Sequence, residues 1–177
     1  VQHIHNRGFE VEIWDWTTKD LPALAATGAT FSSMTGYIEG DLLEEDGIAR
    51  LLETALLSLE ASTIIDAPRL NLHGTGLDSN GQSIRKRDSV TAAEWSTAKD
   101  TLSKLADLGE KHGKQFTLEN LNLAVDHPGT PFARAEDTIA LVEAVNNPHL
   151  ALNLDLYHAQ IGEGNLVELL RRAFPLI

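Results

Sequence analysis

The chain has 177 residues, with 42% hydrophobic and 23% charged side chains and a formal net charge of −12. This length and composition predict one globular domain over residues 1–177, with a substantial core. Nucleic-acid and anionic-membrane surfaces need clustered Lys and Arg, so the acidic balance argues against both partners. The one basic run, Arg85-Lys86-Arg87, is too short to change this and is expected in a solvated loop.

The absence of cysteine excludes disulfides and thiolate chemistry, so any metal must be held by oxygen and imidazole. No run reaches the length of a membrane span, and no signal-peptide pattern opens the chain. We therefore expect a cytoplasmic enzyme. Because the chain starts on Val1 and stops within an apolar segment ending at Ile177, we also expect it to be part of a longer protein.

The first strand–helix unit is predicted before residue 29. A helix tail ends at Gly8, and a strand follows over residues 9–16, with Glu12 on the face opposite its apolar residues. Asp20 then caps a helix that carries Pro22 in its first turn.

Two further units are predicted over residues 29–112. The second strand covers residues 29–37, and Asp46 caps a long helix that runs through Ser62. The third strand carries Leu70 and Leu72 on one face, with Asn71 and His73 opposite. A long polar loop over residues 77–90 leads to a helix that Thr91 and Glu94 open with a capping box and Gly113 ends.

The fourth strand, residues 115–122, ends in a carboxylate. Phe116 and Leu118 share one face of this strand, while Thr117 and Glu119 share the other. A helix over residues 134–146 follows.

The fifth strand repeats this arrangement, because Leu150, Leu152 and Leu154 alternate with Ala151, Asn153 and Asp155. A carboxylate at a strand exit, facing away from the helices, suggests a cation or a substrate. The alternative is that Asp155 caps the following turn. Asn165 and Glu168 predict a weaker capping box for the last helix.

Five β-α units without hairpin signals predict a parallel sheet with right-handed crossovers. A doubly wound sheet and a (β/α)8 TIM barrel both fit, although no Gly-x-Gly-x-x-Gly follows the first strand. Polar residues expected to face inward on four strands favour the barrel, whose strand exits converge on one site. These residues are Glu12, His73, Glu119 and Asp155. Five strands cannot close a barrel that needs eight, so the chain covers about five of its β/α units.

Three segments resemble the hydroxypyruvate isomerase family, which belongs to the xylose isomerase-like TIM barrels and is related to the ketose 3-epimerases. They are Thr117-Leu118-Glu119-Asn120-Leu121-Asn122, Asp126-His127-Pro128-Gly129 and Leu154-Asp155-Leu156-Tyr157-His158-Ala159-Gln160-Ile161-Gly162-Glu163-Gly164-Asn165. Gly8-Phe9-Glu10-Val11-Glu12 is similar to the second strand of that family. The resemblance implies that the first and last strands of the barrel lie outside this chain.

The resemblance also implies a divalent metal site, with Mg²⁺ or Mn²⁺ as the ion that suits hard oxygen ligands. In that family the ligands are a Glu, an Asp, a His or Gln, and a second Glu. Glu119 and Asp155 match the first two, and the other two come from later strands. Glu119 is also the expected catalytic residue, which moves a proton as an enediolate forms from an α-hydroxy carbonyl substrate.

Two histidines are candidate substrate-binding residues. His158 follows Asp155 by three residues, and the family analogy makes it a substrate contact; a hydrogen bond that orients Asp155 is the alternative. His73 is either a substrate contact or a buried histidine bonded to a neighbour. Trp14 is expected either to wall the pocket or to fill the barrel, and His127 to shape its loop.

The resemblance implies an isomerase that interconverts hydroxypyruvate and 2-hydroxy-3-oxopropanoate by metal-assisted proton transfer. A sugar epimerase or isomerase on the same scaffold is the main alternative, since a fold does not fix its substrate. The expected partner is thus a small hydroxy-oxo acid or a sugar, and a homo-oligomer is also considered. A truncated barrel without catalytic activity is the alternative from a different class, and an apurinic endonuclease is disfavoured by the acidic balance.

Overall fold

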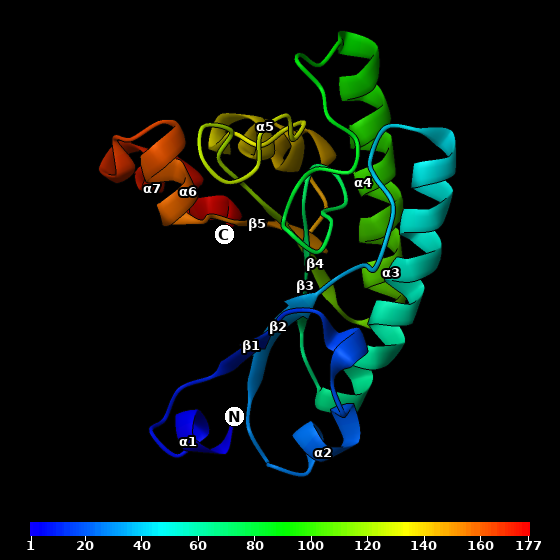
Figure 1. Ribbon diagram of the computed structural model, residues 1–177, viewed down its shortest axis with the longest axis vertical. Coiled ribbons are helices and arrows are strands. Elements are labelled where there is room, and N and C mark those ends of the chain that lie inside the picture. Colours follow the sequence, from blue (N-terminus) through cyan, green and yellow to red (C-terminus); the bar gives the residue numbers. More distant parts are fainter.

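The structure is a computed structural model that describes residues 1–177 (Figure 1). Its five parallel strands are β1 Val11–Ile13, β2 Phe31–Thr35, β3 Arg69–Leu72, β4 Gln115–Glu119 and β5 Leu150–Asn153. Its helices are α1 Gln2–His5, α2 Leu21–Ala25, α3 Glu45–Ile65, α4 Ala92–His112, α5 Ala135–Val145, α6 Leu156–Gly162 and α7 Leu166–Ala173, with short 3₁₀ turns η1 Trp16–Thr18 and η2 Phe174–Leu176.

The strands lie in the order β1-β2-β3-β4-β5, and each pairs in parallel with the next. The long helices α3 and α4 run side by side along one face of this sheet, and α5 packs beside α4 (Figure 1). This sequential order confirms the barrel-type prediction. A doubly wound sheet is excluded because its strand order reverses at a switch point.

The main core lies between the sheet and helices α3, α4 and α5. Alternate strand residues, among them Leu70, Phe116 and Leu118, are fully buried against these helices. Because side chains alternate across a strand, Asn71 and Glu119 lie on the opposite, concave face. The alternation of apolar residues along each strand thus determines which polar side chains meet on the concave face of the sheet.

Several predicted helix ends are confirmed by their hydrogen bonds. Asp20 accepts a hydrogen bond from the Ala23 amide, and Thr91 and Glu94 form the reciprocal capping box of α4. Gly113 ends α4 at φ +64°, a left-handed conformation that glycine adopts without steric cost.

Two local predictions are wrong. Helix α3 begins after Glu44, so Asp46 lies in its first turn and is not the cap. Asn165 adopts a left-handed conformation at φ +47° and its side chain caps nothing, so the capping box with Glu168 does not form. Glu12 lies on the concave face as predicted, opposite the buried Val11 and Ile13, and it is exposed there because β1 is an edge strand.

The basic run at residues 85–87 is not simply solvated. Arg85 forms ion pairs with Asp41 at 2.8 Å and Asp46 at 2.6 Å, both near the start of α3. Arg87 forms ion pairs with Glu44 and with Glu94 of α4. The loop after β3 is therefore tied to the beginnings of two helices.

None of the helices has the combination of length and apolar character needed to span a membrane.

Candidate metal centre

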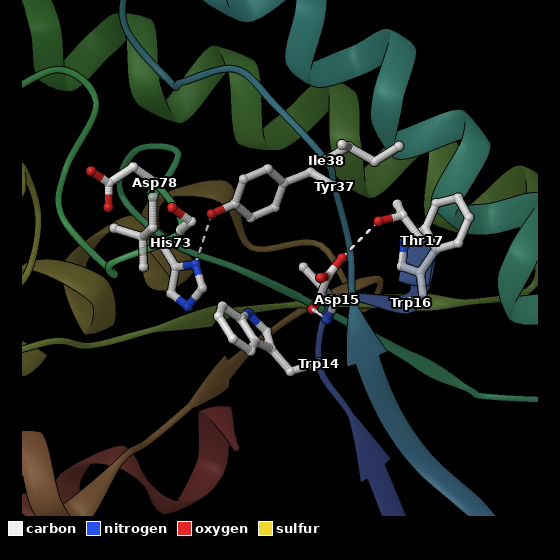
Figure 2. Close-up of a pocket in the computed structure, with 11 residues that line it drawn as sticks. Trp14, Asp15, Trp16, Thr17, Tyr37, Ile38, His73 and Asp78 are labelled. Atoms are coloured by element: carbon white, nitrogen blue, oxygen red, sulfur yellow. Dashed lines mark hydrogen bonds between the residues drawn. The ribbon is translucent and has the colours of Figure 1, made fainter. Parts of the chain in front are cut away.

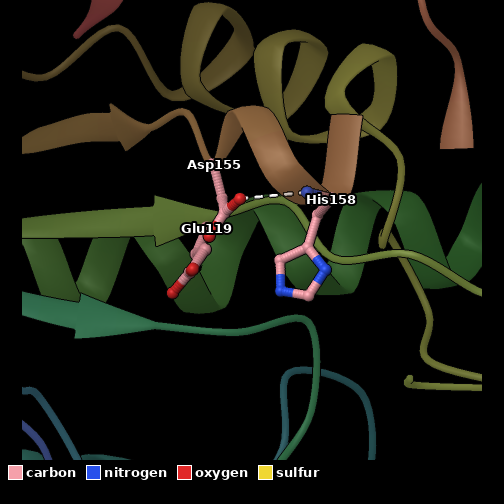
Figure 3. A group of neighbouring side chains, drawn as sticks. All are labelled: Glu119, Asp155 and His158. Carbon is pink, nitrogen blue, oxygen red and sulfur yellow. Dashed lines mark hydrogen bonds between the residues drawn. The ribbon is translucent and has the colours of Figure 1, made fainter. Parts of the chain in front are cut away.

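Glu119, Asp155 and His158 converge at the carboxyl ends of strands β4 and β5 (Figure 3). One potential ligand atom from each lies within 4.8 Å of those of the other two. Glu119 is the last residue of β4, whereas Asp155 and His158 lie just beyond β5 at the start of α6. The two carboxylates that the sequence singled out thus meet on one side of the sheet, as expected for a shared cation.

Asp155 is both a helix cap and a member of this cluster. Its Oδ1 accepts a hydrogen bond from the His158 amide at 3.0 Å, which caps α6. Its backbone is fixed by Asn120, whose side chain accepts from the Asp155 amide at 2.8 Å and donates to the Asp155 carbonyl at 3.0 Å. The alternative prediction, that Asp155 caps the following turn, is therefore correct. The capping hydrogen bond also orients the carboxylate, and it engages only one of the two carboxylate oxygens.

Glu119 is held through its Oε2 atom. The Nδ2 group of Asn71 donates to this oxygen, and His73 Nε2 lies 3.2 Å from it. Only 15% of the Glu119 side chain is exposed. Burial on its own would raise the pKa of Glu119, but contacts with His73 and Asn71 outweigh it and hold the pKa below its ordinary value. Glu119 is therefore an ionised carboxylate, the form that binds metals and accepts protons.

The orientation of Asn71 is set by the neighbouring strands. Its Oδ1 accepts hydrogen bonds from Thr117 Oγ1 and Asn153 Nδ2, each at 3.1 Å. Its Nδ2 group must then face Glu119. Sequence reasoning missed this role, although Asn71 and Asn153 both occupy concave-face positions next to Thr117 and Glu119 in the predicted strands.

His73 contacts protein groups on both ring nitrogens. Its Nδ1 lies 2.8 Å from the Tyr37 hydroxyl and its Nε2 faces Glu119. Tyr37 is buried, and this burial, together with the nearby Glu119 charge, raises the pKa of the phenol. The sequence allowed two interpretations of His73, and the structure confirms that this histidine is bonded to its neighbours. A contact between His73 and substrate stays a prediction.

His158 is 9% exposed and its ring is enclosed by two others. The ring centroids of His127 and Tyr157 each lie 5.1 Å from that of His158, both edge-on. Burial and the neighbouring His127 lower the pKa of His158, despite the opposing effect of nearby carboxylates such as Asp155. His158 is therefore held near the cluster as a mainly neutral imidazole.

A cavity of about 410 Å³ opens over His73, Glu119 and His158. It is lined by Trp14, His73, Leu77, Ser79, Asn80, Gly81, Glu119, Leu121, His127 and His158. A second cavity of about 160 Å³ shares Trp14 and His73 with it and continues toward Tyr37 and Trp16 (Figure 2). Trp14 is 64% exposed, so of its two predicted roles it walls the pocket and does not fill a core.

The donor set fits a hard divalent cation. Two carboxylates meet with an imidazole beside them, and Mg²⁺ and Mn²⁺ prefer oxygen ligands of this kind. The charge of Glu119 is maintained by its own donors, so these side chains present a negative site that a cation would neutralise.

A protein-family model described as "Xylose isomerase-like TIM barrel" matches residues 9–177. Among curated proteins, "Putative hydroxypyruvate isomerase" from Xenopus laevis is 32% identical over 78 residues, which are 44% of this chain and 28% of that protein. The chain thus matches less than a third of the length of this relative.

Solved structures share the fold at lower identity. AP endonuclease, family 2, from Brucella melitensis has a TM-score of 0.77 at 21% identity, covering 97% of this chain and 67% of its own. D-psicose 3-epimerase from Clostridium cellulolyticum H10 with D-tagatose has a TM-score of 0.76 at 18% identity, covering 98% and 63%. IOLI protein with a zinc atom has a TM-score of 0.73 at 17% identity, covering 96% and 61%.

Proposed function

The chain belongs to the xylose isomerase-like TIM barrel family, and on this premise we propose that it carries part of the active site of a metal-dependent isomerase. The proposed reaction interconverts hydroxypyruvate and 2-hydroxy-3-oxopropanoate. The convergence of Glu119 and Asp155 at neighbouring strand ends carries this proposal, because the two carboxylates meet where barrel enzymes place their chemistry. The resemblance to a hydroxypyruvate isomerase over 78 residues supports the choice of substrate.

Glu119 and Asp155 are the residues proposed to hold a divalent metal, Mg²⁺ or Mn²⁺. When bound, such an ion supplies Lewis-acid stabilisation of negative charge on the substrate oxygens. IOLI protein, which shares the fold, is described with a zinc atom, and this supports a metal centre of some kind. Further ligands are expected from parts of the barrel other than these five units.

The reaction moves one hydrogen from C3 to C2 of hydroxypyruvate and one proton from the C3 oxygen to the C2 oxygen, with no net change in atoms. Glu119 is the proposed acceptor of the carbon-bound proton, since it is ionised, mostly buried and beside the cavity. Its lowered pKa keeps the carboxylate ionised and therefore able to accept a proton at neutral pH.

The alternative is an epimerase or isomerase that acts on a sugar. The aromatic extension of the cavity past Trp14 to Tyr37 favours it, because it offers room beyond that needed by a three-carbon acid. The shared fold with D-psicose 3-epimerase is compatible with this alternative but does not select it.

The test is turnover by the whole protein, stripped of metal and then supplied with Mg²⁺ or Mn²⁺. We expect hydroxypyruvate to be consumed and 2-hydroxy-3-oxopropanoate to form, with a larger kcat/KM than for D-psicose or D-tagatose. Faster turnover of a ketose would replace the substrate while keeping the metal-isomerase class. A protein that turns over neither substrate with any added divalent metal would contradict the class itself.

A further inference from the structure

Asn122, in the turn after β4, has a side chain whose orientation the backbone fixes. This residue is 1% exposed. Its Oδ1 accepts hydrogen bonds from the amides of Val125 at 3.0 Å and Asp126 at 3.1 Å. Since backbone amides only donate, the oxygen must lie on this side and the Nδ2 group on the other.

The Nδ2 group of Asn122 faces two acceptors. It lies 2.6 Å from Asp126 Oδ2 and 2.8 Å from His158 Nδ1. An amide NH₂ group can only donate, so His158 Nδ1 must accept. A neutral His158 then carries its ring proton on Nε2.

Asp126 is the nearby acceptor that would favour a ring proton on His158 Nδ1, but its carboxylate is held away from this nitrogen. Asp126 Oδ2 is 3.9 Å from His158 Nδ1, beyond hydrogen-bond range. The same carboxylate oxygen accepts from Asn122 and, at 3.0 Å, from the Tyr157 hydroxyl. Asn122 therefore occupies His158 Nδ1 and also restrains the carboxylate that would compete for it.

This arrangement is the reverse of that around a metal-binding histidine. Such a histidine donates its second ring N–H to a carboxylate or carbonyl, which leaves a lone pair on the nitrogen that faces the metal. His158 instead meets a donor at Nδ1, while its ring lies beside the carboxylates of Glu119 and Asp155 (Figure 3). The Nε2–H of His158 is thus directed at a site of negative charge.

We propose that Asn122 is a positioning residue that locks His158 in the Nε2–H tautomer, so that His158 donates a hydrogen bond to substrate and is not a third metal ligand. The substrate half of this statement rests on the proposed function; the tautomer half does not. A donor at this place would stabilise negative charge on a substrate oxygen, and its hydrogen bond would strengthen as that charge develops.

The test begins with ¹⁵N NMR of the histidine rings in the metal-free protein. We expect His158 to show an unprotonated Nδ1 and a protonated Nε2. In Asn122→Asp the carboxylate still accepts the two loop amides but cannot donate, so we expect the pattern to reverse. Turnover should then fall at least about tenfold, as for other residues that orient an active-site group, whereas affinity for Mn²⁺ should hold or rise because Nε2 gains a lone pair.

Two control variants separate the tautomer from the added charge. Asn122→Asp with Asp126→Asn exchanges the two groups at constant net charge and should behave like Asn122→Asp. Asp126→Asn alone changes the charge but leaves the orientation of Asn122 intact, so it should keep the wild-type ring pattern. If Asn122→Asp does not fold, the exchange variant and the wild-type spectrum still decide.

A protonated Nδ1 in the wild-type protein, or an unchanged ring pattern in the Asn122→Asp variants, would overturn the proposal. The wild-type protein could show the expected ring pattern and yet not act on hydroxypyruvate. That result would keep the positioning role of Asn122 and remove only the proposed substrate.

Discussion

Glu119 is a buried carboxylate whose ionised state depends on donors that other residues hold in place. Asn71 Nδ2 donates to its Oε2, and Thr117 and Asn153 orient Asn71 through its Oδ1. Because the folded-state pKa of Glu119 is lowered, its ionisation stabilises the fold above the unfolded pKa. This stabilisation is lost as pH falls through the folded pKa.

The variant Asn71→Leu tests this dependence. At pH 7 we expect the free energy of unfolding to fall by about 1–3 kcal/mol relative to wild type, the usual cost of removing a hydrogen bond to a buried charge. The difference should shrink in acid, where Glu119 is protonated in both proteins. Urea unfolding at a series of pH values measures it.

Asn153→Leu is the matched control for that variant. Asn153 donates a hydrogen bond to Asn71 but forms none with Glu119, its neighbour across the β4–β5 pair, so its removal should cost an amount that changes less with pH. A loss in Asn71→Leu that is equally independent of pH would show that Asn71 does not maintain the charge of Glu119.

At the scale of strands and helices, local sequence determined most elements because their signals act within a few residues. The Thr91–Glu94 capping box formed, since both partners belong to the same turn. The Asn165–Glu168 pattern failed: the backbone of Asn165 is left-handed, not extended as at a usual N-cap, and its side chain accepts no capping hydrogen bond. Alternation in β4 and β5 sufficed to place Glu119 and Asp155 on one side of the sheet.

Contacts between distant segments were beyond the reach of such patterns. The basic run at residues 85–87 gave no sign that its partners are Asp41 and Glu44, some forty residues earlier in the chain. The Tyr37–His73 pair and the Asn122–His158 pair likewise depend on how neighbouring strands place their loops. Sequence alone singled out the charged members of the candidate site, whereas the groups that orient them required the fold.

At the scale of the whole molecule, the sheet ends at two edge strands. β1 and β5 each pair with only one neighbour, so each has unpaired backbone N–H and C=O groups on its outer side. Large apolar side chains such as Phe9 and Trp14, both 64% exposed, add exposed hydrophobic surface near β1, which promotes association.

We therefore expect residues 1–177 produced alone to self-associate. Light scattering should show a mass above that of the monomer that grows with concentration, and thermal unfolding should be broad. A chain that stays monomeric at high concentration and melts sharply and reversibly would contradict this expectation.

The most direct test of the metal-isomerase proposal compares Glu119→Gln with Asp155→Asn in the whole protein. The measurement is exchange of the substrate C–H hydrogen with solvent during a titration with Mg²⁺ or Mn²⁺. Glu119→Gln keeps a neutral oxygen ligand but cannot accept a proton, so exchange should fall at least about 10²–10⁴-fold even at saturating metal. Asp155→Asn keeps a good helix cap for α6, so it should mainly weaken metal binding, and excess metal should restore much of the exchange. Near-normal exchange in Glu119→Gln at saturating metal would show that Glu119 does not move the proton.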